Sequence, residues 1–195
     1  MLDSALGRLA ELRAAGHELR MAVNLSARHL SDLALPRQVA EALARHGIPP
    51  AMLVLEVTET GILADPARVD AVIGTLRELG VAIAVDDYGT GHASLSYLKT
   101  LEVDELKIDK SFVVDMGRDN HDFIIVRSTI ALATDLGLRV IAEGIEDEET
   151  AVALCKLGCD VGQGYHLGRP TTPEQILLRL NNERSLAAPW PAATL

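Results

Sequence analysis

Two adjacent aspartates, Asp86 and Asp87, stand at the end of an apolar run and are followed by two glycines in the stretch IAVDDYGTG. Two like charges at the point where a buried strand should stop allow two interpretations. One is a site for a divalent cation, which takes carboxylate oxygens as ligands. The other is an ordinary polar strand end with an aspartate-rich turn. The pair alone favours the turn, so the decision depends on the residues around it.

Other polar residues follow short apolar runs at comparable intervals. With Asp86 they form a series spaced from 20 residues (143 to 163) to 36 residues (107 to 143), near the ~30 residues of one strand–helix unit. The series also contains Asn24, Glu56, Lys107, Glu143 and Gln163. Carboxylate and amide oxygens suit Mg²⁺ or Mn²⁺, and the carboxylates would repel one another strongly without a cation. Adjacent aspartates can also bridge two metal ions. The series therefore favours a two-metal site.

Two further charged residues allow two interpretations each. Lys107, within DELKIDK, is either a solvated edge residue or a group at the mouth of a barrel that orients water or stabilises charge on a phosphate. Glu59, three residues after Glu56, either caps the next turn or hydrogen-bonds the loop after Asp87. The sequence contains no H-E-x-x-H, G-x-S-x-G or Walker motif, so zinc-protease, serine-nucleophile and NTPase functions have little support.

The elements that must position these residues are marked by glycines and helix caps. Glycines that follow helix-like segments predict left-handed C-terminal caps at Gly16, Gly47, Gly80, Gly137 and Gly158. Asp65-Pro66, Asp147 and Thr172-Pro173 predict helix starts. The apolar runs predict strands at 21–23, 53–55, 81–85, 106–108, 140–142 and 159–162. Fully apolar runs that alternate with helices indicate a parallel α/β fold.

Two architectures contain such parallel strand–helix units, an open doubly wound sheet and a (β/α)₈ barrel. The dinucleotide fingerprint G-x-G-x-x-G is absent after the first strand. Polar residues at the carboxyl ends of strands are typical of a barrel, whose catalytic groups lie there. We therefore expect a TIM-like barrel that is incomplete, with about six of the eight strand–helix units.

Composition limits the classes of protein and ligand. The 195 residues suffice for one domain, with 48% apolar and 24% charged residues. A net charge of −10 argues against binding a nucleic-acid polymer, but it permits a small phosphate ligand whose charge metal ions balance. Cys155 and Cys159 are expected to be free buried thiols. No apolar run reaches the ~18 residues of a membrane span, so we expect a cytoplasmic chain without membrane contact. Residues 184–195 are expected to form a flexible C-terminal tail.

Six motifs then point to a known family. NLSARHL, LEVTET, AVDDYGTGHASLSYL, DELKIDKSFV, VIAEGIE and GQGYHLGRP resemble, in order, successive motifs of the EAL domain. The resemblance covers about residues 2–180, within an expected domain of residues 1–183. It implies a TIM-like barrel that hydrolyses the bacterial second messenger cyclic di-GMP to linear pGpG, with Mg²⁺ or Mn²⁺ as cofactor.

The resemblance also implies a role for each matching residue. Metal ligands are implied at Asn24, Glu56, Asp86, Asp87 and Glu143, with Asp86 as the bridging ligand. Lys107 matches the lysine that contacts the nucleophilic water, so the implied catalytic set is Lys107, Asp87 and Glu143. Glu59 matches the glutamate that supports the loop after the aspartate pair. Gln163 and Glu146 match positions near the bound nucleotide.

One departure from the family is serious. The Glu-Ala-Leu motif of an early strand, whose glutamate binds metal in the family, and the arginine that follows it have no counterpart here, because the string Glu41-Ala42-Leu43 lies in the helix-like segment before Gly47. LDSALGRLAELRAAG resembles the helix after the family's first two strands, so we expect a truncated EAL domain whose phosphodiesterase activity is impaired. Whether the chain is an enzyme therefore stays open. The alternative is a catalytically degenerate domain that binds cyclic di-GMP or a protein in signalling. Family members often dimerise and adjoin sensory or diguanylate cyclase domains, so such partners are expected. The replacements Tyr88 for Phe and His92 for Tyr are mild.

Overall fold

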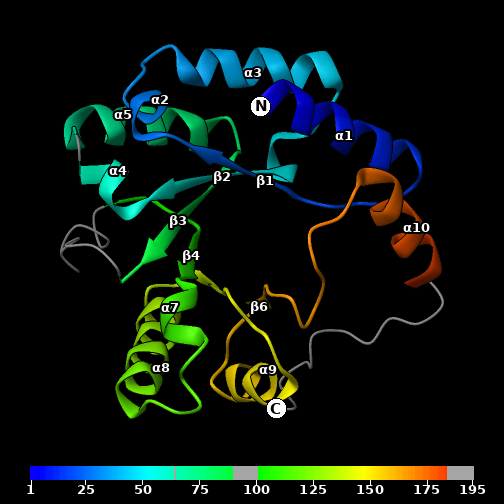
Figure 1. Ribbon diagram of the computed structural model, residues 1–195. Helices are drawn as coiled ribbons and strands as arrows, with labels where there is room; N and C mark the ends of the chain where they lie inside the picture. Colours follow the sequence, from blue (N-terminus) through cyan, green and yellow to red (C-terminus); the bar gives the residue numbers. More distant parts are fainter. Residues whose placement is uncertain (64, 90–100, 184–195) are drawn as a thin grey trace. The chain divides into compact units, whose positions relative to one another are not determined.

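Strands and helices alternate along the computed structural model, which describes residues 1–63, 65–89 and 101–183 (Figure 1). Among these residues the chain forms two compact units. The first contains residues 1–86 and 101–104, and the second contains residues 87–89 and 105–183. Each unit contributes three successive strands that run parallel to their neighbours.

The first unit is a three-stranded parallel sheet covered by helices. Its elements are α1 (Leu2–Ala14), β1 (Met21–Leu25), α2 (Ala27–Leu30), α3 (Leu35–His46), the 3₁₀ turn η1 (Pro50–Met52), β2 (Leu53–Thr58), α4 (Glu59–Leu63), α5 (Pro66–Glu78) and β3 (Ala82–Tyr88), whose last two residues belong to the second unit. The strand order is β1-β2-β3, with Val23 opposite Leu55 and Leu55 opposite Ile83. α1 and α3 pack together over this sheet (Figure 1). Aliphatic side chains with almost no exposed surface fill the core, which fits a chain with only 3% aromatic residues.

The second unit repeats the pattern with shorter strands. It contains β4 (Glu105–Ile108), α7 (Lys110–Val113), α8 (Asn120–Asp135), β5 (Arg139–Ala142), α9 (Glu148–Lys156), β6 (Val161–Gly162) and α10 (Pro173–Glu183). The strand order is β4-β5-β6. α8 contacts α7, β4 and β5, and buries Val126, Ile130 and Ala133. β6 consists of two residues only, so its register depends on few backbone hydrogen bonds.

The predicted helix boundaries are confirmed. All five cap glycines have positive φ, from 63° at Gly47 to 90° at Gly80. Asp65 accepts a hydrogen bond from the backbone N–H of Arg68, Asp147 accepts one from Thr150, and Thr172 accepts one from Gln175. These bonds satisfy N–H groups of the first helical turn.

The six predicted strands are present, and some of their ends differ from the prediction. β2 continues two residues past Glu56 to Thr58, and β3 continues past the aspartate pair to Tyr88. The reason is that Val57 and Thr58 are β-branched and favour extended backbone, and polarity alone does not end a strand. The predicted α/β fold with six parallel strand–helix units is confirmed. The predicted tail, residues 184–195, lies outside the described residues.

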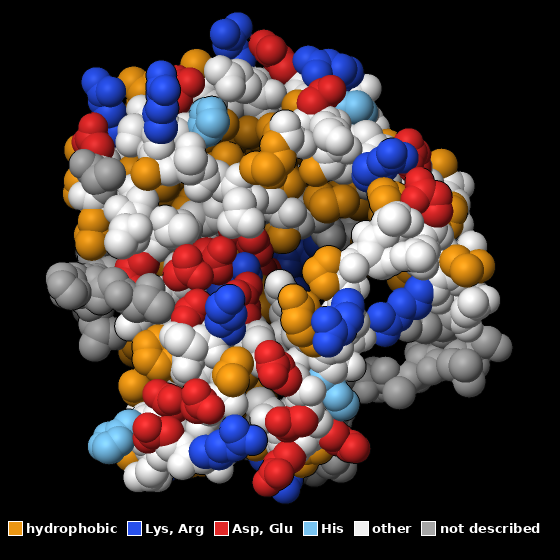
Figure 2. Space-filling model, in the orientation of Figure 1, with side chains coloured by type: hydrophobic (Ala, Val, Ile, Leu, Met, Phe, Trp, Pro, Cys, Tyr) orange, Lys and Arg blue, Asp and Glu red, His pale blue; other side chains and the backbone are white. Residues whose placement is uncertain are grey.

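Surface and thiol chemistry agree with the composition. Basic and acidic side chains are interspersed over α1 and α3 (Figure 2), where they form the ion pairs Arg8–Glu11, Arg37–Glu41 and Arg45–Asp3. Cys155 and Cys159 are free and buried. None of the described helices is long and apolar enough to cross a lipid bilayer.

Candidate functional site

In the first unit, three predicted metal ligands lie on neighbouring strands. Asn24 of β1 is the register partner of Glu56 of β2, and Glu56 is the partner of Ala84 of β3. Asp86 lies two residues beyond Ala84. Because partners across parallel strands face the same side and side chains alternate along a strand, Asn24, Glu56 and Asp86 face one side of the sheet.

These side chains differ in how deeply they are buried. Glu56 is 8% exposed and Asp86 is 9% exposed, whereas Asn24 on the first strand is exposed. Glu59 begins α4 and is 3% exposed. Acidic side chains are almost never this buried without partners, and every buried side-chain nitrogen and oxygen of the described residues has a hydrogen-bond partner. These carboxylates therefore belong to polar networks within an otherwise apolar sheet.

In the second unit, a buried ion pair joins the strand ends. Lys107 Nζ of β4 lies 2.6 Å from Glu143 Oε1, and the two side chains are 4% and 18% exposed. Lys107 is the register partner of Ile141, and Glu143 lies two residues further on the same side. The Glu143 backbone N–H donates to Ile108 O at 3.2 Å, which holds the residue just past the strand. The interpretation of Lys107 as a solvated edge residue is wrong, because its side chain is buried against a carboxylate.

Asp87 adds a second carboxylate beside Glu143. Ligand oxygens of Asp87 and Glu143 lie within 4.8 Å of each other, and Asp86 directly precedes Asp87. Asp87 is the one described residue other than glycine with positive φ, at 54°. Aspartate tolerates this region better than most residues, and such conformations often occur at functional sites. Two close carboxylates are a donor set that fits a hard divalent cation.

A neighbouring aspartate that the sequence reasoning did not select also lies here. Burial raises the pKa of Asp109, but hydrogen bonds from the Ser111 hydroxyl and from the backbone N–H groups of Ser111 and Lys110 outweigh it, and contact with Asp87 acts with them. The net effect is a lowered pKa, so Asp109 favours its anionic form. Its position two residues after Lys107, within the motif DELKIDKSFV, was the available signal.

The turn after β5 brings Gln163 to the same strand ends. The Gln163 backbone N–H donates to Ala142 O at 2.8 Å, and Ile145 N–H donates to Gln163 O at 3.1 Å. Gly164 lies so close to the Ile145 backbone that a Cβ atom would collide with it. Gly144 has φ of 78°, and a Cβ there would lie 2.6 Å from Lys110 Cβ. These two glycines make the close approach possible.

The predicted residues thus divide between the two units. The first brings together Asn24, Glu56 and Asp86, and the second brings together Asp87, Lys107 and Glu143. Gln163 lies at the neighbouring strand end with an exposed side chain, and Glu146 is also exposed. The loop that Glu59 is predicted to support, residues 90–100 with His92, lies outside the described residues.

Comparisons with known proteins agree with the motifs. The family described as the EAL domain matches residues 1–170. The bifunctional diguanylate cyclase/cyclic di-GMP phosphodiesterase MucR of Pseudomonas aeruginosa is 40% identical over 178 residues, which are 91% of this chain and 26% of MucR. The chain therefore spans about a quarter of this curated relative.

Solved structures extend the similarity to the fold. The PaMucR phosphodiesterase in complex with c-di-GMP superposes with a TM-score of 0.86 at 40% identity, covering 90% of this chain and 71% of that one. The EAL domain of Mycobacterium smegmatis DcpA gives 0.88 at 36% identity, covering 93% and 82%. A manganese/cy-diGMP complex of Klebsiella pneumoniae BlrP1 gives 0.81 at 29% identity, covering 88% and 43%. The predicted TIM-like class of fold is confirmed by these similarities.

Proposed function

The chain belongs to the EAL-domain family, and from that premise we propose that it is a metal-dependent phosphodiesterase domain that hydrolyses cyclic di-GMP to linear pGpG. The observation that carries the proposal is the buried Lys107–Glu143 ion pair with the Asp87 carboxylate beside it. Lysine side chains normally keep the ammonium group in water, so the burial of Lys107 indicates that its charge has a role at this position.

The proposed metal ligands are Asn24, Glu56, Asp86, Asp87 and Glu143, with Mg²⁺ or Mn²⁺ as the ion. All of them offer oxygen, the ligand atom that these hard cations prefer. Bound cations of this kind lower the pKa of water and stabilise charge on phosphoryl and leaving oxygens. A structure similar to this chain contains manganese together with the cyclic dinucleotide, which supports the choice of ion.

The proposed roles of the chain's own groups follow from their contacts. Lys107 orients the attacking water and offsets negative charge near phosphorus, while Glu143 fixes the direction of the Lys107 ammonium. Water adds to phosphorus, one P–O ester bond breaks, and the leaving oxygen takes a proton. Asp87 and Glu143 are close enough to share one cation. Glu59 supports the loop after the aspartate pair.

The nucleotide side of the proposal rests on the region around Gln163. Gln163 contributes to a cavity of about 420 Å³, together with Tyr165, Arg169, Ile176 and Arg179, and no acidic side chain is among the described residues that line it. The Arg169 guanidinium lies 4.4 Å from the centre of the Tyr165 ring. Cationic side chains suit the phosphates of a nucleotide, and a flat aromatic ring suits stacking with its base. We propose that Gln163 and Glu146 lie near the bound nucleotide.

We further propose that residues 1–195 alone hydrolyse the substrate slowly. The glutamate of the family's Glu-Ala-Leu strand, a metal ligand there, has no counterpart on a strand of this sequence, whose own Glu41-Ala42-Leu43 lies in α3. Loss of a residue that binds the metal directly should lower metal affinity or activity by more than the ~10–100-fold that is typical when a residue behind the ligands is changed. The second candidate function is binding of cyclic di-GMP without hydrolysis, as a signalling module. The same missing carboxylate favours it.

One experiment separates the two. The purified chain is incubated with Mn²⁺ and cyclic di-GMP, linear product is measured by chromatography, and binding is measured by calorimetry. Slow turnover that EDTA and Glu143→Gln both abolish supports hydrolysis, with exposed Glu149→Gln of α9 as the matched control. Binding without product supports the second candidate. Neither binding nor product refutes both.

A further inference from the structure

An aspartate directly before a strand occurs once in each unit in the same structural role. Asp104 precedes β4, and its Oδ2 accepts a hydrogen bond of 2.9 Å from the backbone N–H of Ile83. Asp160 precedes β6, and its Oδ2 accepts one of 2.8 Å from the backbone N–H of Val140. Ile83 and Val140 are each the second residue of the preceding strand, β3 or β5. In each unit, an aspartate side chain thus accepts a hydrogen bond from the second residue of a strand.

Each residue of these hydrogen bonds lies three positions before a residue of the proposed site. Three residues after Val140 and Asp160 come Glu143 and Gln163, respectively. Asp86 comes three residues after Ile83, and Lys107 comes three residues after Asp104. At a rise of about 3.3 Å per residue, each bond lies about 10 Å before the site residues on its own strands. The hydrogen bonds therefore lie where they can fix the position of each strand along its own axis, and with it the position of the site residue that follows.

The second unit needs such a device because its strands are short. β6 has two residues, and its ladder with β5 consists of the partners Ile141–Val161 and Ala142–Gly162. A slip of one residue turns every side chain of a strand to the other face. The Asp160–Val140 bond adds a fixed point at the beginning of a ladder that has few others.

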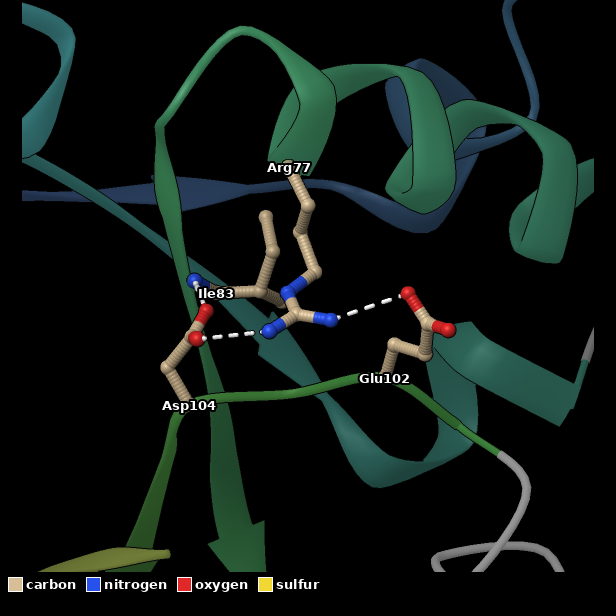
Figure 3. Close-up of polar contacts among 4 residues, drawn as sticks. All are labelled: Arg77, Ile83, Glu102 and Asp104. Carbon is tan, nitrogen blue, oxygen red and sulfur yellow. Dashed lines mark hydrogen bonds and ion pairs between the residues drawn. The ribbon is translucent and has the colours of Figure 1, made fainter.

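The bond in the first unit is reinforced from a helix. Arg77, in the last turn of α5, donates from Nη2 to Asp104 Oδ1 at 3.0 Å and from Nη1 to Glu102 Oε2 at 2.9 Å (Figure 3). Asp104 N–H also donates to Ile83 O at 2.9 Å, so the two residues exchange two bonds. The planar guanidinium holds the carboxylate in the orientation that Ile83 requires.

We propose that Asp104 and Asp160 are positioning residues. Asp160 fixes the register of β5 against β6, and through it the placement of Glu143 and Gln163, while Asp104 holds the start of β3, and through it the placement of Asp86. Arg77 orients Asp104 for this purpose. The part that concerns turnover rests on the proposed function, whereas the part that concerns register stands on the two hydrogen bonds alone.

The test begins with Asp160→Ala and Asp160→Asn in the full chain. Loss of the bond in Asp160→Ala should raise the hydrogen-exchange rate of the Val140 amide about tenfold, the effect of one ordinary hydrogen bond. Asp160→Asn should restore slow exchange, because its amide oxygen still accepts from Val140. Asp135→Ala replaces an exposed aspartate at the end of α8 and should leave Val140 unchanged. Fast exchange in the Asn variant, or unchanged exchange in the Ala variant, would overturn the proposal.

Turnover and metal binding supply the second readout. Asp160→Ala should lower kcat about tenfold with a smaller change in KM, and Asp160→Asn should recover most of it. A role in charge alone predicts that Asn behaves like Ala. If the wild-type chain neither turns over substrate nor binds Mn²⁺, the proposed function fails, and Val140 exchange still decides the register proposal.

The first unit is tested by the same logic at the Ile83 amide. Arg77→Met should raise Ile83 exchange by less than Asp104→Ala does, because Asp104 retains its acceptor oxygen. The control is Arg68→Met, which removes an exposed ion pair with Asp65 on the same helix. Equal Ile83 exchange in Arg77→Met, Asp104→Ala and wild type would refute this half.

Discussion

Replacing Lys107 by Met should make the stability of this chain strongly dependent on metal. Met keeps an unbranched side chain of similar length and removes the charge. The ammonium lies 2.6 Å from Glu143 Oε1, and the two side chains are 4% and 18% exposed. Removing one partner of such a pair typically costs about 3–5 kcal/mol, because it leaves a buried charge uncompensated.

The structure gives an independent estimate of the same order. Without Lys107, the carboxylates of Asp87 and Glu143 face each other within 4.8 Å. At an effective dielectric constant of about 20, two unit charges at that distance repel by about 3 kcal/mol. A divalent cation bound between them would replace the lost positive charge. We therefore expect a loss of about 3 kcal/mol in EDTA, by the argument from buried pairs, and a clearly smaller loss in saturating Mg²⁺.

The assay is urea unfolding of wild type and Lys107→Met, each in EDTA and in excess Mg²⁺, with ΔG taken from midpoints at constant slope. Lys156→Met is the control, since Lys156 is exposed in the last turn of α9 and surface replacements stay within about 0.5 kcal/mol. Lys107→Met should also lose turnover in Mn²⁺, because a bound cation does not replace the ammonium group that orients the attacking water. Equal destabilisation with and without Mg²⁺ would show that no cation binds beside Glu143, and would refute the reasoning.

Two further changes test parts of the structure near the site. Gly144→Ala should cost at least about 2 kcal/mol in urea unfolding, because φ is 78° and the new Cβ would meet Lys110 Cβ; Gly74→Ala within α5, where no atom lies within 4 Å, should instead stabilise slightly, and a neutral Gly144→Ala would contradict the described turn. Burial raises the pKa of Cys159 to about 11 from its usual 9.0, so the folded state keeps the neutral thiol while the unfolded chain ionises first. Stability from this group is complete below pH 9 and falls as pH rises towards 11, by up to about 2.7 kcal/mol for two pKa units. Cys159→Ala should remove this part of the pH dependence, and identical slopes between pH 9 and 11 for both proteins would contradict it.

The sequence predicted the elements well because their signals are local. Cap glycines such as Gly47 and N-caps such as Asp147 act within one helical turn, so their types alone reveal the boundaries. Strand ends were less accurate, since Val57 and Thr58 continue β2 after the charged Glu56. Lys107 shows why polarity alone can mislead: only the neighbouring strand reveals that it is buried against Glu143. The residues of the candidate site were predicted from the spacing of polar residues and from the family motifs.

Residues whose role depends on register stayed hidden. Asp104 and Asp160 look like ordinary loop aspartates, and nothing in the sequence shows which backbone N–H each one meets. Asp109 was part of a recognised motif, but its contact with Asp87 depends on where two strands end. Side chains that act through a partner far away in sequence require the strand pairing to be known.

The aspartate pair has a position that neither a turn nor a cap explains. Asp86 belongs to the first compact unit, and Asp87 belongs to the second. Consecutive Cα atoms are separated by about 3.8 Å across a trans peptide, so the backbone positions of the two aspartates stay adjacent. Asp86 shares its face of the sheet with Asn24 and Glu56, while Asp87 lies beside Glu143. The positive φ of Asp87 departs from extended strand backbone and carries a local energetic cost. If metal binding depends on that turn, Asp87→Asn should keep the fold and weaken Mn²⁺ binding, whereas Asp87→Val should also lose stability, because a β-branched residue resists positive φ.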